Sequence, residues 1–189
     1  MEYAEHSAFI RITHWINAIA FFGLLVSGVA ILLAHPRLYW GETGVLGSPS
    51  LIDLPLPFML TGQSGWGRYL HFLAAWVCVL NGLLYVASGV IARLFGNGFS
   101  AYKALQRLTY LAVIFVLFPL MIWTGFAMSP AITSVFPEVV MIFGGQQSAR
   151  TIHFFAGDLL VVFLLAHVAM VCFTGFTSNM RGMIAGGAD

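Results

Sequence analysis

Four histidines carry most of the chemistry that this sequence offers. His14, His71, His153 and His167 each lie within an apolar stretch long enough to cross a membrane. An ionisable side chain in such a place is costly, so it indicates a functional site by default. The alternative for any single one is a histidine at the membrane interface, or one that hydrogen-bonds between helices.

The spacing of these histidines predicts two pairs at two depths. His153 and His167 are 14 residues apart, which is about 21 Å along a helix axis and within roughly 40° of the same face. Because successive spans run in opposite directions, His71 shares the depth of His153, and His14 shares the depth of His167. The sequence therefore predicts two bis-histidine sites stacked across the membrane.

Three of the histidines follow an arginine on the same helix face. Each arginine stands three positions earlier, and the pairs are Arg11 with His14, Arg68 with His71, and Arg150 with His153. Haem iron takes an imidazole on each side, and the haem propionates need cations. A zinc or copper transport site would need clustered ligands. It would have no use for arginines between its ligands and the aqueous face. The pattern predicts two haems, the outer with axial ligands His71 and His153 and the inner with His14 and His167, and the three arginines as propionate partners.

The haems are predicted to be of the non-covalent b type, because the sequence contains no Cys-x-x-Cys-His for covalent attachment. Gly28 falls on the helix face of His14 at the depth of the outer pair, where a missing side chain would admit a flat macrocycle. Close packing of membrane helices explains a glycine there at least as well.

The elements that must position these residues are membrane spans. Of the 189 residues, 60% are hydrophobic and only 8% are charged, whereas a soluble domain carries roughly a quarter charged residues. The net charge of +1 gives no basic surface for nucleic acid. The predicted fold is an all-α membrane protein, a four-helix transmembrane bundle that forms one cytochrome b domain over residues 1–189. The predicted spans are about 9–34, 66–94, 105–129 and 151–176.

The distribution of Lys and Arg predicts the orientation. With both termini in the cytoplasm, the cations on the inner side are Arg11, Arg93, Lys103, Arg107 and Arg181, and those on the outer side are Arg37, Arg68 and Arg150. Two loops of about 36–65 and 130–149 then lie outside. Both are apolar, which indicates either a docking surface or a belt at the lipid headgroups.

These residues resemble the prokaryotic four-helix di-haem membrane cytochrome b family. Its members include the cytochrome b subunits of nickel–iron hydrogenases, the gamma subunit of formate dehydrogenase and the thiosulfate-reductase-type cytochrome b subunits. The resemblance covers nearly the whole chain, and the matching features are Arg11-Ile12-Thr13-His14-Trp15, Ser27-Gly28, His71, and the spacing of His153 and His167.

The resemblance implies an electron-transfer subunit of the bacterial inner membrane that also anchors a partner. A periplasmic oxidoreductase of molybdopterin, hydrogenase or iron–sulfur type would exchange electrons at the outer haem. Menaquinone or ubiquinone would do so near the cytoplasmic face, beside the start of the third span. The quinone-site candidates there are Gln106, Arg107 and Tyr110, and the proton-route candidates are Glu5, His6 and Asp158. A structural role is the alternative for Asp158.

Two other functions remain open at this point, and so does the direction of electron flow. One is a stand-alone di-haem enzyme that oxidises superoxide or a small donor and reduces quinone. The other is a haem-free proton or metal transporter that uses its histidines as relays. Haem content distinguishes the transporter from the electron-transfer subunit and the stand-alone enzyme. Co-purification with a soluble subunit distinguishes the electron-transfer subunit from the stand-alone enzyme.

Overall fold

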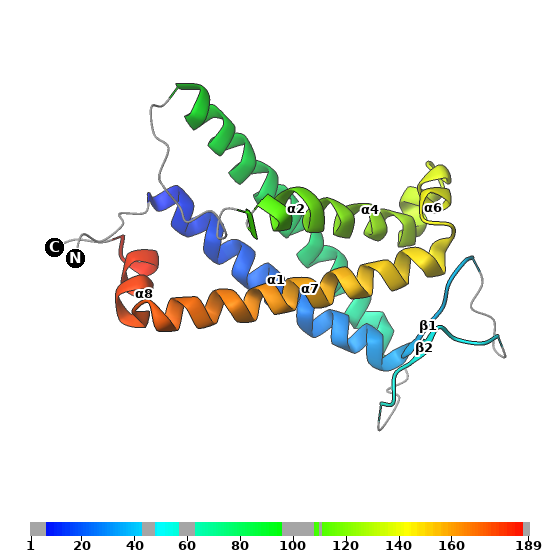
Figure 1. The fold of residues 1–189 in the computed structure, drawn as a ribbon. Helices are drawn as coiled ribbons and strands as arrows, with labels where there is room; N and C mark the ends of the chain where they lie inside the picture. Colours follow the sequence, from blue (N-terminus) through cyan, green and yellow to red (C-terminus); the bar gives the residue numbers. More distant parts are fainter. Residues whose placement is uncertain (1–6, 43–47, 57–62, 96–107, 110, 187–189) are drawn as a thin grey trace. The chain divides into compact units, whose positions relative to one another are not determined.

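A computed structural model describes residues 7–42, 48–56, 63–95, 108–109 and 111–186. Its elements in chain order are α1 (Ala8–Ala34), β1 (Arg37–Leu38), β2 (Ile52–Asp53), α2 (Gln63–Phe95), the π-helix η1 (Val113–Leu117), α4 (Phe118–Met128), α5 (Pro130–Thr133), α6 (Glu138–Ile142), α7 (Gln146–Phe173) and α8 (Phe176–Ile184) (Figure 1). The chain forms two compact units. Unit 1 comprises residues 1–35, 56–99 and 167–189, and unit 2 comprises residues 36–55 and 100–166.

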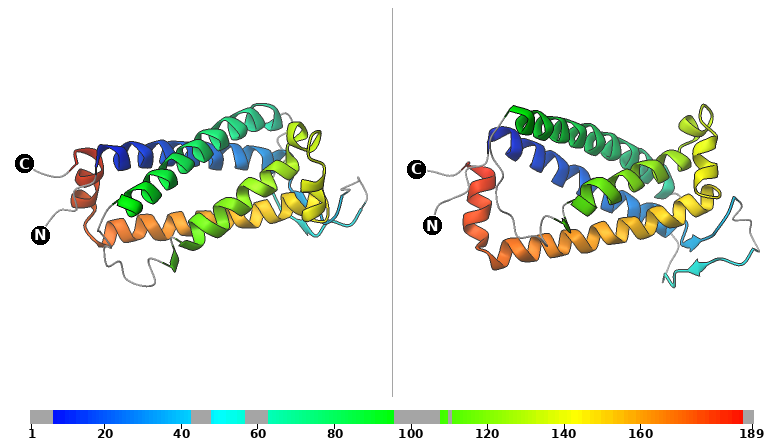
Figure 2. Two further views of the ribbon diagram at one scale, coloured as in Figure 1. Left: turned by 90° about the horizontal axis from the view of Figure 1, so that it is seen from above. Right: turned by 45° about the horizontal axis from the view of Figure 1, so that its top comes forward.

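In unit 1, α1 and α2 lie alongside each other (Figure 2). Small residues allow this approach, as is common between membrane helices. A Cβ added at Gly23 would lie 3.4 Å from the Cβ of Ala74, and one added at Gly67 would lie 3.3 Å from the Cβ of Ala30. The two helices therefore pack closely enough to bring their polar side chains into contact.

Unit 1 also contains the end of α7 and the short helix α8. Gly175 adopts φ +114° between them, a left-handed conformation that glycine tolerates best, and α8 turns away from α7 at this point (Figure 2). The Trp15 indole Nε1 donates a 3.0 Å hydrogen bond to the carbonyl of Met183. This bond fixes α8 against the first half of α1.

In unit 2, a π-helix leads into α4. Pro119 has no N–H to donate, and its ring clashes with the carbonyl four residues earlier, so the regular hydrogen-bond ladder cannot continue through this position. The wider π-helical turn over Val113–Leu117 accommodates this break. The buried core at the far end of α4 is formed by Ala127, Val139 and Ala149, from α4, α6 and α7.

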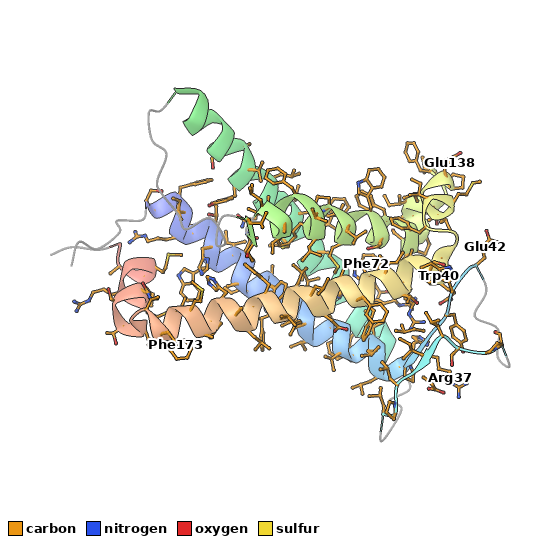
Figure 3. The ribbon with its side chains drawn as sticks, in the orientation of Figure 1. Arg37, Trp40, Glu42, Phe72, Glu138 and Phe173 are labelled. Carbon is orange, nitrogen blue, oxygen red and sulfur yellow. The ribbon has the colours of Figure 1, made fainter. Side chains whose placement is uncertain are left out.

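The segment after α1 is held against the start of α7. β1 pairs antiparallel with β2, and Arg37 Nε lies 3.0 Å from Asp53 Oδ2. Further along, the Gly41 N–H donates to Ser148 Oγ (2.7 Å), and Thr151 Oγ1 donates to the Tyr39 carbonyl (2.7 Å). Figure 3 labels Arg37, Trp40 and Glu42 along this segment.

Three described helices are long and apolar enough to span a membrane, over Ala8–Ala34, Gly65–Gly89 and Gln146–Phe173. They match the first, second and fourth predicted spans. A shorter apolar helix, Val113–Met128, lies within the third predicted span, and residues 105–107 and 110 of that span lie outside the described residues. The mostly helical membrane architecture is confirmed, and the third of the four predicted spans stays a prediction.

The last predicted span begins earlier in the structure than the hydropathy pattern indicates. α7 begins at Gln146, five residues before the predicted start at 151. Its first turn contains Gln146, Gln147 and Ser148, polar residues that an apolar pattern does not include. Gly144 and Gly145, with φ +70° and +128°, separate this turn from α6.

Candidate haem sites

The predicted inner pair lies together within unit 1. His14 is on α1 and His167 is near the end of α7, and their ring centroids are 6.3 Å apart with an interplanar angle of 50°. A metal–imidazole bond of about 2 Å, plus roughly 1.1 Å from nitrogen to ring centre, places two axial imidazoles about 6 Å apart. The observed separation would suit His14 and His167 as two ligands of one haem iron.

A cation with an open hydrogen-bonding position accompanies this pair. Arg11 lies one helical turn before His14, and its Nη1 is buried with no hydrogen-bond partner among the described residues. The backbone at Gly186 comes so close that an added Cβ would overlap the guanidinium. Because a buried donor without a partner is costly, this atom fits a missing acceptor such as a haem propionate.

His71, on α2, contacts the dipeptide Ser27-Gly28 of α1. Its Nδ1 lies 3.0 Å from Ser27 Oγ, and Ser27 is fully buried. A Cβ added at Gly28 would lie 3.9 Å from the ring atom Cε1. Gly28 is therefore beside a predicted outer ligand, as expected from its depth.

His153, on α7, has the same environment in unit 2. Its Nδ1 lies 2.8 Å from Thr124 Oγ1 on α4, and Thr124 is also fully buried. A Cβ added at Gly125 would lie 3.8 Å from His153 Cε1. Each predicted outer ligand thus contacts a hydroxyl residue followed by glycine. His71 and His153 belong to different units, so their pairing stays a prediction.

The other predicted site residues have varied surroundings. Arg68 is exposed on α2, and Arg150 is half-buried on α7, where it interacts electrostatically with Tyr39. Asp158 is on an exposed face of α7. The remaining candidates lie outside the described residues, and they are Gln106, Arg107, Tyr110, Glu5 and His6.

Sequence reasoning missed two polar residues. Thr124 bonds a predicted ligand, and Asn81 Nδ2 donates a 2.7 Å hydrogen bond to the carbonyl of Thr13, next to His14. Asn81 is only 6% exposed, so it fixes α2 to α1 beside the inner pair. Thr124 could have been found from the sequence, because Thr124-Gly125 repeats the pattern of Ser27-Gly28, a hydroxyl residue followed by glycine.

These features define a multi-pass membrane protein with histidines, on its long apolar helices, that are candidates to hold haem. The comparison with known proteins agrees, because the family model described as prokaryotic cytochrome b561 matches residues 5–186. The chain belongs to this family, and it is a membrane protein that binds b-type haem and transfers electrons. This family membership sets aside the haem-free transporter.

The chain is also similar to a curated protein of Azospira oryzae. That protein is named as a putative protein-methionine-sulfoxide reductase subunit, YedZ1, and the two are 30% identical over 199 aligned positions. The similarity covers 89% of this chain and 90% of the relative.

Proposed function

We propose that the chain is a di-haem electron-transfer subunit that connects the quinone pool to a periplasmic oxidoreductase and anchors it. The observation that carries this proposal is the His14–His167 pair, with ring centroids 6.3 Å apart, in a chain of a haem-binding family. Arg11, one helical turn before His14, adds a cation whose Nη1 is buried without a hydrogen-bond partner among the described residues.

The second haem of the proposal has His71 and His153 as axial ligands, with Arg68 and Arg150 toward its propionates. Three observations support this assignment. Their spacing in sequence gives them one depth, each has its Nδ1 bonded to a buried hydroxyl, and each has a glycine beside its ring.

The bundle of the proposal has four spans, with the segment around Val113–Met128 as the third. It forms a single cytochrome b domain over residues 1–189. Both termini lie in the cytoplasm, as the Lys and Arg distribution predicts for a protein of the bacterial inner membrane. The outer haem then faces the periplasm.

The name of the Azospira relative favours one electron direction. Since that protein is named as a subunit of a reductase, we assign this chain the delivery of electrons from quinol to a periplasmic reductase. Gln106, Arg107 and Tyr110 are the proposed quinone-site residues, and Glu5, His6 and Asp158 are the proposed proton route. Menaquinone and ubiquinone both suit this chemistry.

Bound haem supplies a one-electron couple at each site. The four histidines would hold the iron, the three arginines would neutralise the propionates, and the apolar helices would exclude water. Water exclusion and hydrogen bonds to the ligands are two of the means by which a protein sets a haem potential.

Anaerobic spectroscopy of the purified protein tests this function. Addition of duroquinol is expected to reduce the haem, seen as the α-band of the reduced cytochrome. Haem that stays oxidised under duroquinol but is reduced by superoxide would support the stand-alone enzyme instead. Co-purification of a periplasmic reductase subunit would establish the partner, and its absence under mild extraction would contradict the anchor role.

A further inference from the structure

The two predicted outer ligands have matching hydrogen-bond partners. Ser27 Oγ lies 3.0 Å from His71 Nδ1, and Thr124 Oγ1 lies 2.8 Å from His153 Nδ1. Both hydroxyl residues are 0% exposed, so water does not compete for either bond. The sites have different hydroxyl side chains, yet each presents the same atom type to the same ring nitrogen.

The remaining contacts of the two hydroxyls are all with carbonyl oxygens, and they favour one direction for each bond to histidine. Ser27 Oγ lies 3.1 Å from the Leu24 carbonyl and Thr124 Oγ1 lies 3.2 Å from the Met121 carbonyl, and a second carbonyl is closer to each. Ser27 Oγ is 2.7 Å from the Gly23 carbonyl, and Thr124 Oγ1 is 2.7 Å from the Leu120 carbonyl. This is the usual length of an O–H···O bond. A hydroxyl has a single proton. If that proton pointed to the imidazole, two acceptor oxygens would lie in contact with no hydrogen between them.

The geometry points to Ser27 and Thr124 as positioning residues that accept the Nδ1–H of His71 and His153 and leave each Nε2 unprotonated to bind haem iron. The inference rests on the proposed function, since it takes these two histidines as the ligands of the outer haem. In each site the chain of donors runs from imidazole Nδ1–H to hydroxyl, and from hydroxyl to backbone carbonyl.

Such a partner does more than orient the ring. A hydrogen bond accepted from the distal N–H of a ligating histidine raises the basicity of the coordinating nitrogen. A more basic ligand favours the oxidised metal, so the two hydroxyls together lower the potential of the outer haem. Removal of either hydroxyl is expected to raise that potential.

The test is a redox titration of the full-length protein with Ser27→Ala and Thr124→Val. We expect full haem content, and a roughly tenfold shift of the outer haem toward the reduced form at fixed ambient potential. This corresponds to about 59 mV for a one-electron couple. The inner haem stays unchanged, and His14→Ala, which retains the outer haem, identifies the two waves.

Conservative variants and matched controls separate this role from simple packing. Ser27→Thr and Thr124→Ser keep the acceptor and are expected to restore the native potential. Ser88→Ala and Thr133→Val remove helical hydroxyls that bond the carbonyls of Tyr85 and Ser129, and they leave both potentials in place. The low-spin ferric EPR signal of the outer haem is expected to move only in Ser27→Ala and Thr124→Val.

Each outcome has a definite meaning. Unchanged potentials in Ser27→Ala and Thr124→Val, with both haems present, would overturn the positioning role, even if His71→Ala still removes one haem. Two haems in His71→Ala would instead contradict the ligand assignment of the proposed function. If Ser27→Ala loses the outer haem, Ser27→Cys keeps the volume with a poorer acceptor, and an unchanged potential in that variant would refute the inference.

Discussion

At the scale of single residues, the local environments of the histidines distinguish the two sites. His71 and His153 each have a buried hydroxyl at Nδ1 and a glycine near Cε1. His14 and His167 face each other, with Arg11 close by on the same helix face. These differences allow each site to be tested by its own substitutions.

The first prediction concerns the glycines beside the proposed outer ligands. Gly28→Leu and Gly125→Leu are expected to reduce haem content from about two to about one per chain. A large side chain there would occupy the space next to the ring of the proposed ligand, where the proposed haem would lie. A pyridine haemochrome assay measures this. Gly82→Leu is the control, because an added Cβ at Gly82 meets no atom within 4 Å, and equal loss in all three variants would contradict the account.

The second prediction at this scale concerns Arg11 and the rate at which the inner haem is lost. Arg11→Gln removes a half-buried cation whose Nη1 is buried and lacks a partner in the described structure. A charge-assisted hydrogen bond contributes about 1.5–3 kcal/mol, so retention of the inner haem is expected to weaken by roughly tenfold or more. Haem transfer to apomyoglobin gives the rate of loss. Arg37→Gln, whose guanidinium pairs with exposed Asp53, should not change this rate, and an equal effect would refute the role of Arg11.

At the scale of elements, the segment after α1 is fixed to α7 by backbone contacts. Gln147 N–H and Ser148 N–H donate to the Gly41 carbonyl at 3.0 and 3.3 Å. Gly145 lies so close to Gly41 that an added Cβ would overlap the Gly41 backbone. The contact requires glycine at 145, and it fixes Gly41 against the start of α7.

A matched pair of glycine variants tests this attachment. Gly145→Ala has both the steric overlap and φ +128°, so it is expected to destabilise the protein by roughly 3 kcal/mol. Gly144→Ala has φ +70° and meets nothing within 4 Å, so about 1 kcal/mol is expected. Thermal unfolding in detergent ranks the two. Equal melting temperatures for both variants would contradict the contact.

The sequence was sufficient to predict some elements and not others. Depth follows from residue spacing along a helix, so the level of His14 relative to His167 could be derived. The bond from Thr124 to His153 joins residues 29 positions apart, on helices whose relative rotation depends on side-chain packing. Likewise, nothing in the apolar pattern indicates that Asn81 donates to the Thr13 carbonyl.

At the scale of the whole molecule, the proposal requires one orientation in the membrane. Ser134 and Ser178 are both exposed, the first after α5 and the second on α8. In a background with Cys78 and Cys172 replaced by alanine, Ser134→Cys is expected to react with an impermeant maleimide in spheroplasts. Ser178→Cys should react only after permeabilisation, and the reverse pattern would contradict the proposed orientation.

The most direct measurement of the central claim is the number of haems per polypeptide in the wild type and in histidine variants. The account predicts about two b-type haems in the wild type, and about one in each of His14→Ala and His71→Ala. His35→Ala, an exposed histidine after α1, should retain both. A single haem in the wild type, or equal loss from His35→Ala, would contradict the proposed ligand pairs.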